Sequence, residues 1–328
     1  MKWRKTAALI MGILLLSAAL TGCMRSYSSP EPSPGATETA AKPKIPSKLQ
    51  LENGVPQLNV YNVDKKDIQG MDIESYVQGV LAGEMRADWP MEALKAQAIL
   101  ARTFVLKFVD EKESKYKGAD VSTDITEAQA YDEAKINDRI IKAVDETRGQ
   151  VLSYNGAFPY AWFHAHAGGK TELATKALDF KDQEPGYTQS VDSPDSDRAP
   201  DSVKNWTATF TAEEVGAAAE KAGAKTGTVK TIEIGEKGES GRAVTFKING
   251  NDVSAPALRV ALDPVKLKST LLKEVSVSGG KVTFSGSGYG HGVGMSQWGA
   301  YGMAEQGAKA KDIVMHYFKN VSVVQLWQ

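Results

Sequence analysis

One glycine-dense segment, residues 286–302, constrains the fold more than any other part of the 328-residue chain. Five glycines alternate from 286 to 294, and chemically active side chains lie among or directly after them, namely Tyr289, His291, Ser296, Gln297 and Trp298. Glycine loses more conformational entropy on folding than any other residue, so this density needs a reason. A flexible linker is one explanation, and a loop whose backbone closely approaches a ligand is the other. Linkers seldom carry Tyr, His, Gln and Trp so densely, and we therefore interpret the segment as a binding loop.

The N-terminus has the features of a secretory targeting segment. Three cations in residues 2–5 precede an apolar stretch, residues 7–20, which is shorter than the about 20 apolar residues that span a membrane. This stretch ends in the sequence Leu20-Thr21-Gly22-Cys23, which resembles a bacterial lipobox. We expect residues 1–22 to be a signal peptide and Cys23 to carry a lipid. An uncleaved membrane anchor is the alternative, and both interpretations place the rest of the chain outside the cytoplasm.

The composition excludes some classes of protein. Cys23 is the single cysteine, so the mature chain has no internal disulfide and no thiolate metal cluster. The formal net charge is −1, which gives no basic surplus for a nucleic-acid partner. The first part of residues 23–56 is rich in Ser, Pro, Thr and Ala, and we interpret this range as a flexible tether. We expect ordered structure to start near Gln57.

Beyond the tether, helical and strand patterns alternate irregularly, which predicts an α+β fold. Residues 206–285 combine one helical pattern with three strand patterns and glycine-containing turns. We interpret them as an inserted α/β section within a domain that spans residues 57–328. Residues 180–205 are polar and are expected to form a long surface loop, and a last helix is expected from about Ala310 to Phe318.

The first predicted helix carries an unusually placed carboxylate. Asp72 is a suitable N-cap for a helix from Ile73 to about Met85, whose apolar residues recur at spacings of three and four. Glu84 falls on this apolar face. A carboxyl in an apolar environment has a raised pKa, as a general acid requires near neutral pH. The alternative is that the helix ends nearby and Glu84 points into solvent.

The second predicted helix follows Asp88, with Pro90 in its first turn, and continues to about Asp110. Lys95 and Arg102 lie seven residues apart on one face among alanines, which allow close packing. A buried Arg102 needs a partner, either Glu84 or a ligand, whereas a solvated face needs none. A third helix is expected from about Asp132 to Thr147.

Two histidines lie near the middle of the chain. His164 and His166 have the spacing of residues on one side of a strand, where they could hold a metal together with His291. Trp162, just before them, either stacks on a sugar ring or belongs to the core.

These motifs together resemble the stage II sporulation protein D (SpoIID)/LytB family. Three blocks carry the resemblance, namely Leu81-Ala82-Gly83-Glu84-Met85 with the Glu92–Thr103 helix, the aromatic-to-Gly-Gly-Lys-Thr turn that ends at Thr171, and Gly288–Ala300. They occur in consistent order between about Leu58 and Tyr317, over most of the mature chain. The resemblance implies a SpoIID-like domain with a helical active-site segment, and a lytic transglycosylase whose essential acid is Glu84.

The resemblance also implies a reaction and partners. Such enzymes cleave the MurNAc-β-1,4-GlcNAc bond of peptide-stripped glycan strands and leave 1,6-anhydro-MurNAc ends. They act in septal wall degradation during engulfment, beside a SpoIIP-type amidase/endopeptidase and a SpoIIM-type membrane protein. Here Arg102 would orient Glu84 or the sugar, and five residues would line the glycan groove, namely Tyr289, His291, Ser296, Gln297 and Trp298.

The chain also departs from the family pattern. Some relatives bind zinc through cysteines, which the mature domain lacks, so we expect no metal and no other cofactor. The lipobox differs from the uncleaved anchor of the better-known sporulation members. It predicts a lipid-anchored protein on the extracytoplasmic face of the membrane. If the chain acts as SpoIID does, we expect it at the sporulation septum. A LytB-like enhancer of a cell-wall amidase, which binds glycan without cutting it, is the main alternative. A zinc hydrolase that uses His164, His166 and His291 is a third.

Overall fold

The computed structural model describes residues 40–328. The predicted signal peptide, Cys23 and the first part of the tether lie outside these residues. The packed chain begins earlier than Gln57, because Leu49 and Val55 are buried and the first strand starts at Leu51. The expectation of an unstructured tether up to residue 56 is therefore wrong for its last residues.

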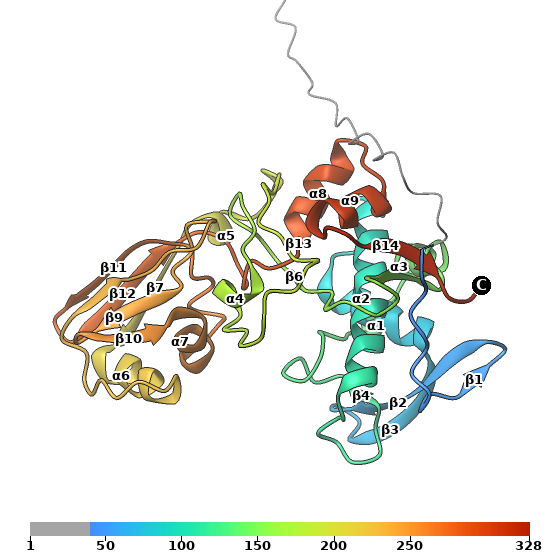
Figure 1. The fold of residues 1–328 in the computed structure, drawn as a ribbon, viewed down its shortest axis with the longest axis horizontal. Coiled ribbons are helices and arrows are strands. Elements are labelled where there is room, and N and C mark those ends of the chain that lie inside the picture. Colours follow the sequence, from blue (N-terminus) through green and yellow to red (C-terminus); the bar gives the residue numbers. More distant parts are fainter. Residues whose placement is uncertain (1–39) are drawn as a thin grey trace, which may run out of the picture.

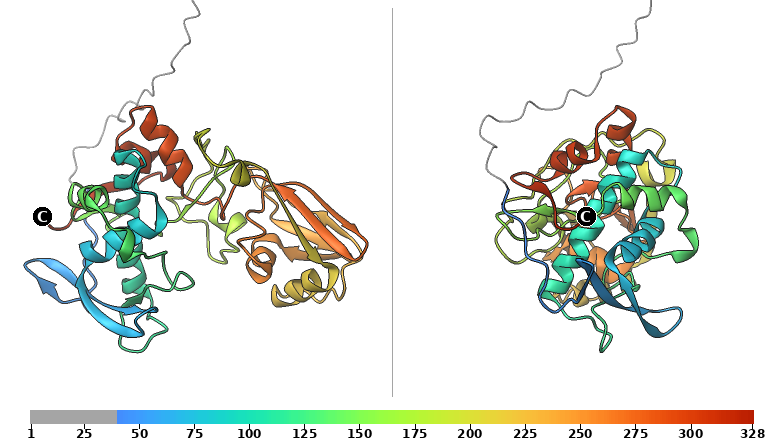
Figure 2. Two further views of the ribbon diagram at one scale, coloured as in Figure 1. Left: turned by 180° about the vertical axis from the view of Figure 1, so that it is seen from behind. Right: turned by 90° about the vertical axis from the view of Figure 1, so that its right-hand side faces the viewer.

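The described residues form two lobes that lie side by side, with a connecting region between them (Figures 1 and 2). Each lobe has its own hydrophobic core, one built from residues 49–187 and 295–327 and the other from residues 206–284. We call these the first and second lobes. Helices and mainly antiparallel small sheets make up both, so the predicted α+β class is confirmed.

The first lobe surrounds one long helix, α2 (Met91–Glu111), whose side chains are buried on most sides. Its other elements are the helices α1 (Ile73–Glu84), α3 (Asp138–Asp145), α8 (Gln297–Glu305) and α9 (Ala310–Tyr317), the 3-10 helix η1 (Glu133–Lys135), and the strands β1 (Leu51–Glu52), β2 (Val55–Asn62), β3 (Asp67–Asp72), β4 (Val121–Ser122), β5 (Gln150–Ser153) and β14 (Ser322–Gln325). Strand β14 pairs antiparallel with β5, so residues 322–325 complete a sheet of the first lobe together with residues 150–153.

The second lobe contains a three-stranded antiparallel sheet in the order β11-β12-β7 and another in the order β10-β9-β8. Its elements are β7 (Trp206–Thr211), α6 (Ala212–Lys221), β8 (Ile232–Ile234), β9 (Thr245–Ile248), β10 (Asn251–Ser254), α7 (Ala255–Leu262), β11 (Leu272–Ser278) and β12 (Lys281–Gly286). Thr211 caps α6 in a reciprocal capping box with Glu214.

The connecting region holds β6 (Phe163–His164), α4 (Ala174–Ala177), α5 (Asp201–Lys204) and β13 (Met295–Ser296). Strands β6 and β13 pair in parallel, which brings residues 163–164 beside residues 295–296. The segment expected as a surface loop, residues 180–205, is only partly exposed, because Thr188, Ser193 and Ser196 are buried in it.

Local signals set the ends and the faces of α1. Asp72 caps the helix by accepting a hydrogen bond from the Ser75 backbone N–H at 2.9 Å. The four apolar residues of the predicted face, Ile73, Val77, Val80 and Leu81, are fully buried. The prediction of this helix is confirmed in both cap and orientation.

Candidate functional site

Glu84 is the last residue of α1, where it is half-buried and lines a cavity of about 570 Å³. Its Oε1 accepts a hydrogen bond from the Ala130 backbone N–H at 2.8 Å, and its Oε2 accepts one from Gln297 Nε2 at 3.2 Å. Both oxygens are therefore held by groups that come from distant parts of the chain.

Burial raises the pKa of Glu84, and the hydrogen bonds from Ala130 and Gln297 offset only part of this effect. A larger fraction of this carboxyl is protonated near neutral pH than for a glutamate in water. A raised pKa is one property that a general acid needs near neutral pH.

Two glycines in α1 allow the Ala130 N–H to reach Glu84. A Cβ atom at Gly83 would lie 2.7 Å from the Tyr131 backbone nitrogen, and one at Gly79 would lie 2.1 Å from the Tyr131 ring. Glycine inside a helix is less favourable than alanine by about 1 kcal/mol, so two of them on one face indicate a close crossing by another segment. The spacing of Gly79 and Gly83 is the feature of the sequence that indicates this crossing, and the contribution of Ala130 was not predicted without it.

Gln297 reaches Glu84 because it begins a helix, which corrects the prediction of one continuous loop over residues 286–302. Residues 297–305 form α8, and Ser296 is its N-cap, accepting from the Gly299 N–H at 3.2 Å. Buried Ser296 also donates to Asp195 Oδ1 at 2.6 Å. Its hydroxyl is thus used within the fold and does not line the Glu84 cavity.

The alternating glycines pack against the protein itself. Gly288, Gly290, Gly292 and Gly294 all have positive φ, between 68° and 108°. A Cβ atom at Gly294 would lie 2.1 Å from the Trp162 carbonyl oxygen. Close packing between this segment and the connecting region therefore explains the glycine density without a ligand.

Tyr289 and His291 lie apart from the Glu84 cavity, contrary to the predicted groove. The Tyr289 backbone exchanges hydrogen bonds with that of His166, at 2.9 and 3.0 Å. His291 lines another cavity, of about 490 Å³, where burial, assisted by the nearby guanidinium groups of Arg259 and Arg242, lowers its pKa to about 3.

Trp298 belongs to an aromatic cluster. Its ring centroid lies 4.4 Å from that of Trp89 and 5.2 Å from that of Tyr301. Trp298 is half-buried and does not line the Glu84 cavity, so Gln297 is the one predicted groove residue that the structure brings to Glu84.

Arg102 has a different partner from the one that the sequence suggests. Its guanidinium is fully buried and forms an ion pair with Glu74, with Nε 3.1 Å from Glu74 Oε1, and its Nη1 donates to the Gln150 carbonyl at 3.0 Å. Glu74 lies ten residues before Glu84 along α1, which is about 15 Å of helix. The expectation that Arg102 orients Glu84 directly is therefore wrong.

Comparisons with known proteins identify the family. The family model described as "Stage II sporulation protein" matches residues 61–154. The stage II sporulation protein D of Bacillus amyloliquefaciens is 32% identical over 291 residues, which cover 83% of this chain and 80% of the relative. The protein of the same name from Bacillus subtilis is 31% identical over 88% of this chain and 84% of the relative. The chain belongs to the SpoIID family.

The chain also matches a protein with a different name and a second family model. The amidase enhancer of Bacillus subtilis is 30% identical to the SpoIID-family chain over 75% of the chain but 40% of the enhancer. A second family model, described as a domain of unknown function, matches residues 169–294, which include the second lobe. Membership of the SpoIID/LytB family makes the chain a cell-wall and sporulation protein that interacts with peptidoglycan, in a family that includes lytic transglycosylases.

A second carboxylate lies on the same cavity of this SpoIID-family protein. Asp88, which sequence analysis proposed as a helix cap, lines the cavity and bonds Arg86 Nη2 at 2.7 Å. The hydrogen bonds from Arg86 lower the pKa of Asp88, so this carboxyl stays ionised. The N-cap of α2 is instead Pro90.

The histidines of the connecting region have separate partners. His164 Nδ1 lies 3.1 Å from the Val293 carbonyl oxygen, whereas His166 Nδ1 lies 3.4 Å from Asp195 Oδ2. Among residues 40–328, no three His, Cys, Asp or Glu side chains are grouped so as to hold a metal ion. The same residues include no helix with the length and apolarity of a membrane span.

Proposed function

We propose that the protein is a peptidoglycan lytic transglycosylase that cleaves the MurNAc-β-1,4-GlcNAc bond of peptide-stripped glycan strands. Glu84 is its acid and base. The observation that carries the proposal is the Glu84 carboxyl itself, which has a raised pKa, lies on a cavity and is held by Ala130 and Gln297.

The reaction requires one carboxyl group. Protonated Glu84 donates its proton to the glycosidic oxygen as the bond from that oxygen to C1 of MurNAc breaks, and the substrate's own acetamido oxygen stabilises the positive charge at C1. The ionised carboxylate then takes the proton of the MurNAc C6 hydroxyl as O6 bonds to C1. The products are a GlcNAc end and a 1,6-anhydro-MurNAc end, Glu84 is protonated again, and no water is consumed.

Asp88 has no step in this reaction. An ordinary glycosidase uses two carboxyl groups, one of which attacks the sugar or activates a water molecule. Asp88 is largely exposed and paired with Arg86, an arrangement typical of a surface ion pair. A hydrolase that uses Asp88 would release reducing ends that carry an added water.

The membrane anchor and the partners complete the proposal. Cys23 would carry the lipid that holds the protein on the outer face of the membrane, where labelled palmitate should be incorporated by the wild type and not by Cys23→Ser. A SpoIIP-type amidase would first strip the peptides, and a SpoIIM-type membrane protein would hold the complex at the septum during engulfment.

The test uses full-length protein in detergent and purified glycan strands that are already free of peptides, with the products identified by mass spectrometry. The wild type should generate anhydro-MurNAc ends, and Glu84→Gln should generate none. Glu52→Gln is the matched control, because Glu52 is exposed on β1. Equal cleavage by wild type and Glu84→Gln would refute the assignment of the acid.

The second candidate function is enhancement of a cell-wall amidase, which the match to the Bacillus subtilis amidase enhancer favours. An enhancer would bind glycan strands and accelerate an added amidase while cutting nothing itself. The same glycan preparation, analysed with and without an amidase, separates the two functions.

A further inference from the structure

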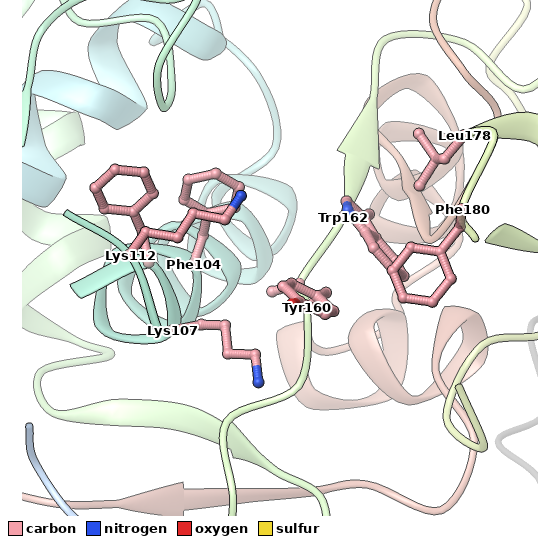
Figure 3. A pocket seen from close by; sticks show the side chains of 9 residues that line it. Phe104, Lys107, Lys112, Tyr160, Trp162, Leu178 and Phe180 are labelled. Atoms are coloured by element: carbon pink, nitrogen blue, oxygen red, sulfur yellow. The ribbon is translucent and has the colours of Figure 1, made fainter. Parts of the chain in front are cut away.

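A second cavity, of about 320 Å³, lies between α2 and the connecting region. Phe104 and Lys112 lie on one side of it, Trp162 and Phe180 face them from the other, and Tyr160 lies between the two sides (Figure 3). The cavity shares no lining residue with the Glu84 cavity. Its size is at the lower end of small-molecule sites and suits one sugar unit.

The aromatic side of the cavity is held in place by its own contacts. The rings of Tyr160 and Trp162 stack at 5.0 Å and 19°, and Phe180 meets Trp162 edge-on at 5.6 Å. All three rings are nevertheless half-buried, although core packing would cover them. Clustered half-exposed aromatic rings indicate a binding surface, and their faces suit the C–H face of a sugar.

The charged residues of the lining are both cations. Lys107 is 15% exposed, and its Nζ lies 4.6 Å from the centre of the Tyr160 ring while it pairs with Glu111. Lys112 forms no ion pair with any residue in the 40–328 range. The Glu111 carboxylate, which accepts from the Tyr160 hydroxyl at 2.7 Å and whose pKa both lysines help to lower, offsets one of these two cations. Two lining cations beside this one carboxylate leave a net positive charge, which favours an anionic substituent on the ligand.

We propose that this cavity binds one N-acetylmuramic acid residue of a peptide-free strand, with its ring against Trp162 and its lactyl carboxylate on Lys112. The inference rests on the proposed function for the identity of the polymer. The lactyl group of N-acetylmuramic acid would account for a preference for peptide-free strands. Where a stem peptide is attached, the lactyl group is an uncharged amide followed by a bulky chain, and removal of the peptide leaves a free carboxylate. The site would thus anchor the protein on strands that an amidase has already processed.

The test measures binding by calorimetry with full-length Glu84→Gln protein in detergent, so that no ligand is cut and the result does not depend on catalysis. The ligands are a peptide-free MurNAc–GlcNAc tetrasaccharide, the same sugar with its carboxylates converted to methylamides, and chitotetraose. We expect the acid to bind about tenfold more tightly than the methylamide, as a charge-assisted contact predicts. Lys112→Glu should remove this preference, whereas Lys311→Glu, on the exposed face of α9, should keep it.

A second readout locates the ligand. In protein labelled with fluorotryptophan, the tetrasaccharide with free carboxylates should shift the Trp162 resonance. This resonance is assigned from its loss in Trp162→Phe. In Lys112→Glu, unchanged resonances of the other tryptophans would show that the variant is folded. Equal binding of acid and methylamide, undiminished binding by Lys112→Glu, or a ligand that leaves Trp162 unshifted would each overturn the proposal. The binding experiment uses inactive Glu84→Gln, so a negative binding result would not bear on whether the wild type cleaves glycan. Conversely, absence of cleavage by the wild type would not alter the binding result.

Discussion

The buried ion pair between Arg102 and Glu74 gives the sharpest test of the structure, because the sequence alone suggests a catalytic role for Arg102. In the structure, Glu74 accepts hydrogen bonds from Arg102, from the Gly149 N–H at 3.0 Å and from Trp327 Nε1 at 2.8 Å. One carboxylate thus joins α1, α2, the turn before β5 and the end of the chain. We predict that Arg102→Met destabilises the fold and has no direct effect on the glycan-cleaving reaction.

The size of the effect follows from burial. Both side chains are almost fully buried, at 0% and 2% exposure, so Arg102→Met leaves a carboxylate without its cation inside the first lobe. Removal of one partner of a buried pair costs about 3–5 kcal/mol. With a urea m-value of about 1–3 kcal/mol per molar, the midpoint of the first lobe should fall by roughly 1–5 M.

The assay is urea unfolding followed by tryptophan fluorescence, combined with glycan cleavage at a temperature where the variant is still folded. The double variant Arg102→Met with Glu74→Gln should be less destabilised than Arg102→Met alone, because a neutral amide still accepts from Trp327 and no charge is left unpaired. Arg198→Met is the control, since Arg198 pairs with Glu305 at the surface and such pairs contribute about 0–1 kcal/mol.

One result would refute this reasoning. If Arg102→Met unfolds at the wild-type urea concentration and yet cleaves no glycan, Arg102 acts on the substrate or on Glu84, as the sequence suggests. Loss of stability with cleavage retained in the folded fraction would support the structural role.

Three further predictions concern the Glu84 cavity. Because burial raises the pKa of Glu84, the folded state binds this proton more tightly than the unfolded state, and stability is lost as the pH rises from the unfolded value, about 4.3, through the folded one. Glu84→Gln should therefore be more stable than wild type in urea at pH 7.5, by about 1.4 kcal/mol for each unit of the shift, and the difference should vanish near pH 4. Asp88→Asn should still release anhydro-MurNAc ends in mass spectra, within a few-fold of the wild-type rate, because the reaction uses no second carboxyl. Gly83→Ala should reduce the kcat of cleavage by about 10–100-fold, because its Cβ would push Tyr131, and with it the Ala130 N–H, away from Glu84.

Each of these predictions has a contrary outcome. A wild-type protein as stable as Glu84→Gln at pH 7.5 would mean that the carboxyl is not effectively desolvated. Loss of all cleavage in Asp88→Asn, with wild-type products that carry an added water, would indicate a two-carboxylate hydrolase. Full activity of Gly83→Ala would mean that the Ala130 hydrogen bond contributes nothing to the reaction.

Local sequence signals predicted several parts of the fold well. The cap at Asp72 and the apolar face of α1 each depend on residues within one or two turns, which a sequence displays directly. The same periodicity placed Glu84 on the apolar face. The helix α8 was missed, because Gly299 and Gly302 lower helix propensity, while tertiary packing against Tyr317 and the Pro194 carbonyl requires them.

The sequence by itself determined the α+β class and the family, and it singled out Glu84 as a candidate acid. The tertiary structure decided what each polar group contacts. Glu84 meets Ala130 across 46 residues of chain and Gln297 across 213, whereas Arg102 meets Glu74 across 28. The physical reason is that periodicity shows which face of a helix is buried but not what packs on it. A buried charge must be paired, but which of several candidate partners lies within hydrogen-bonding distance is set by the packing of the whole lobe.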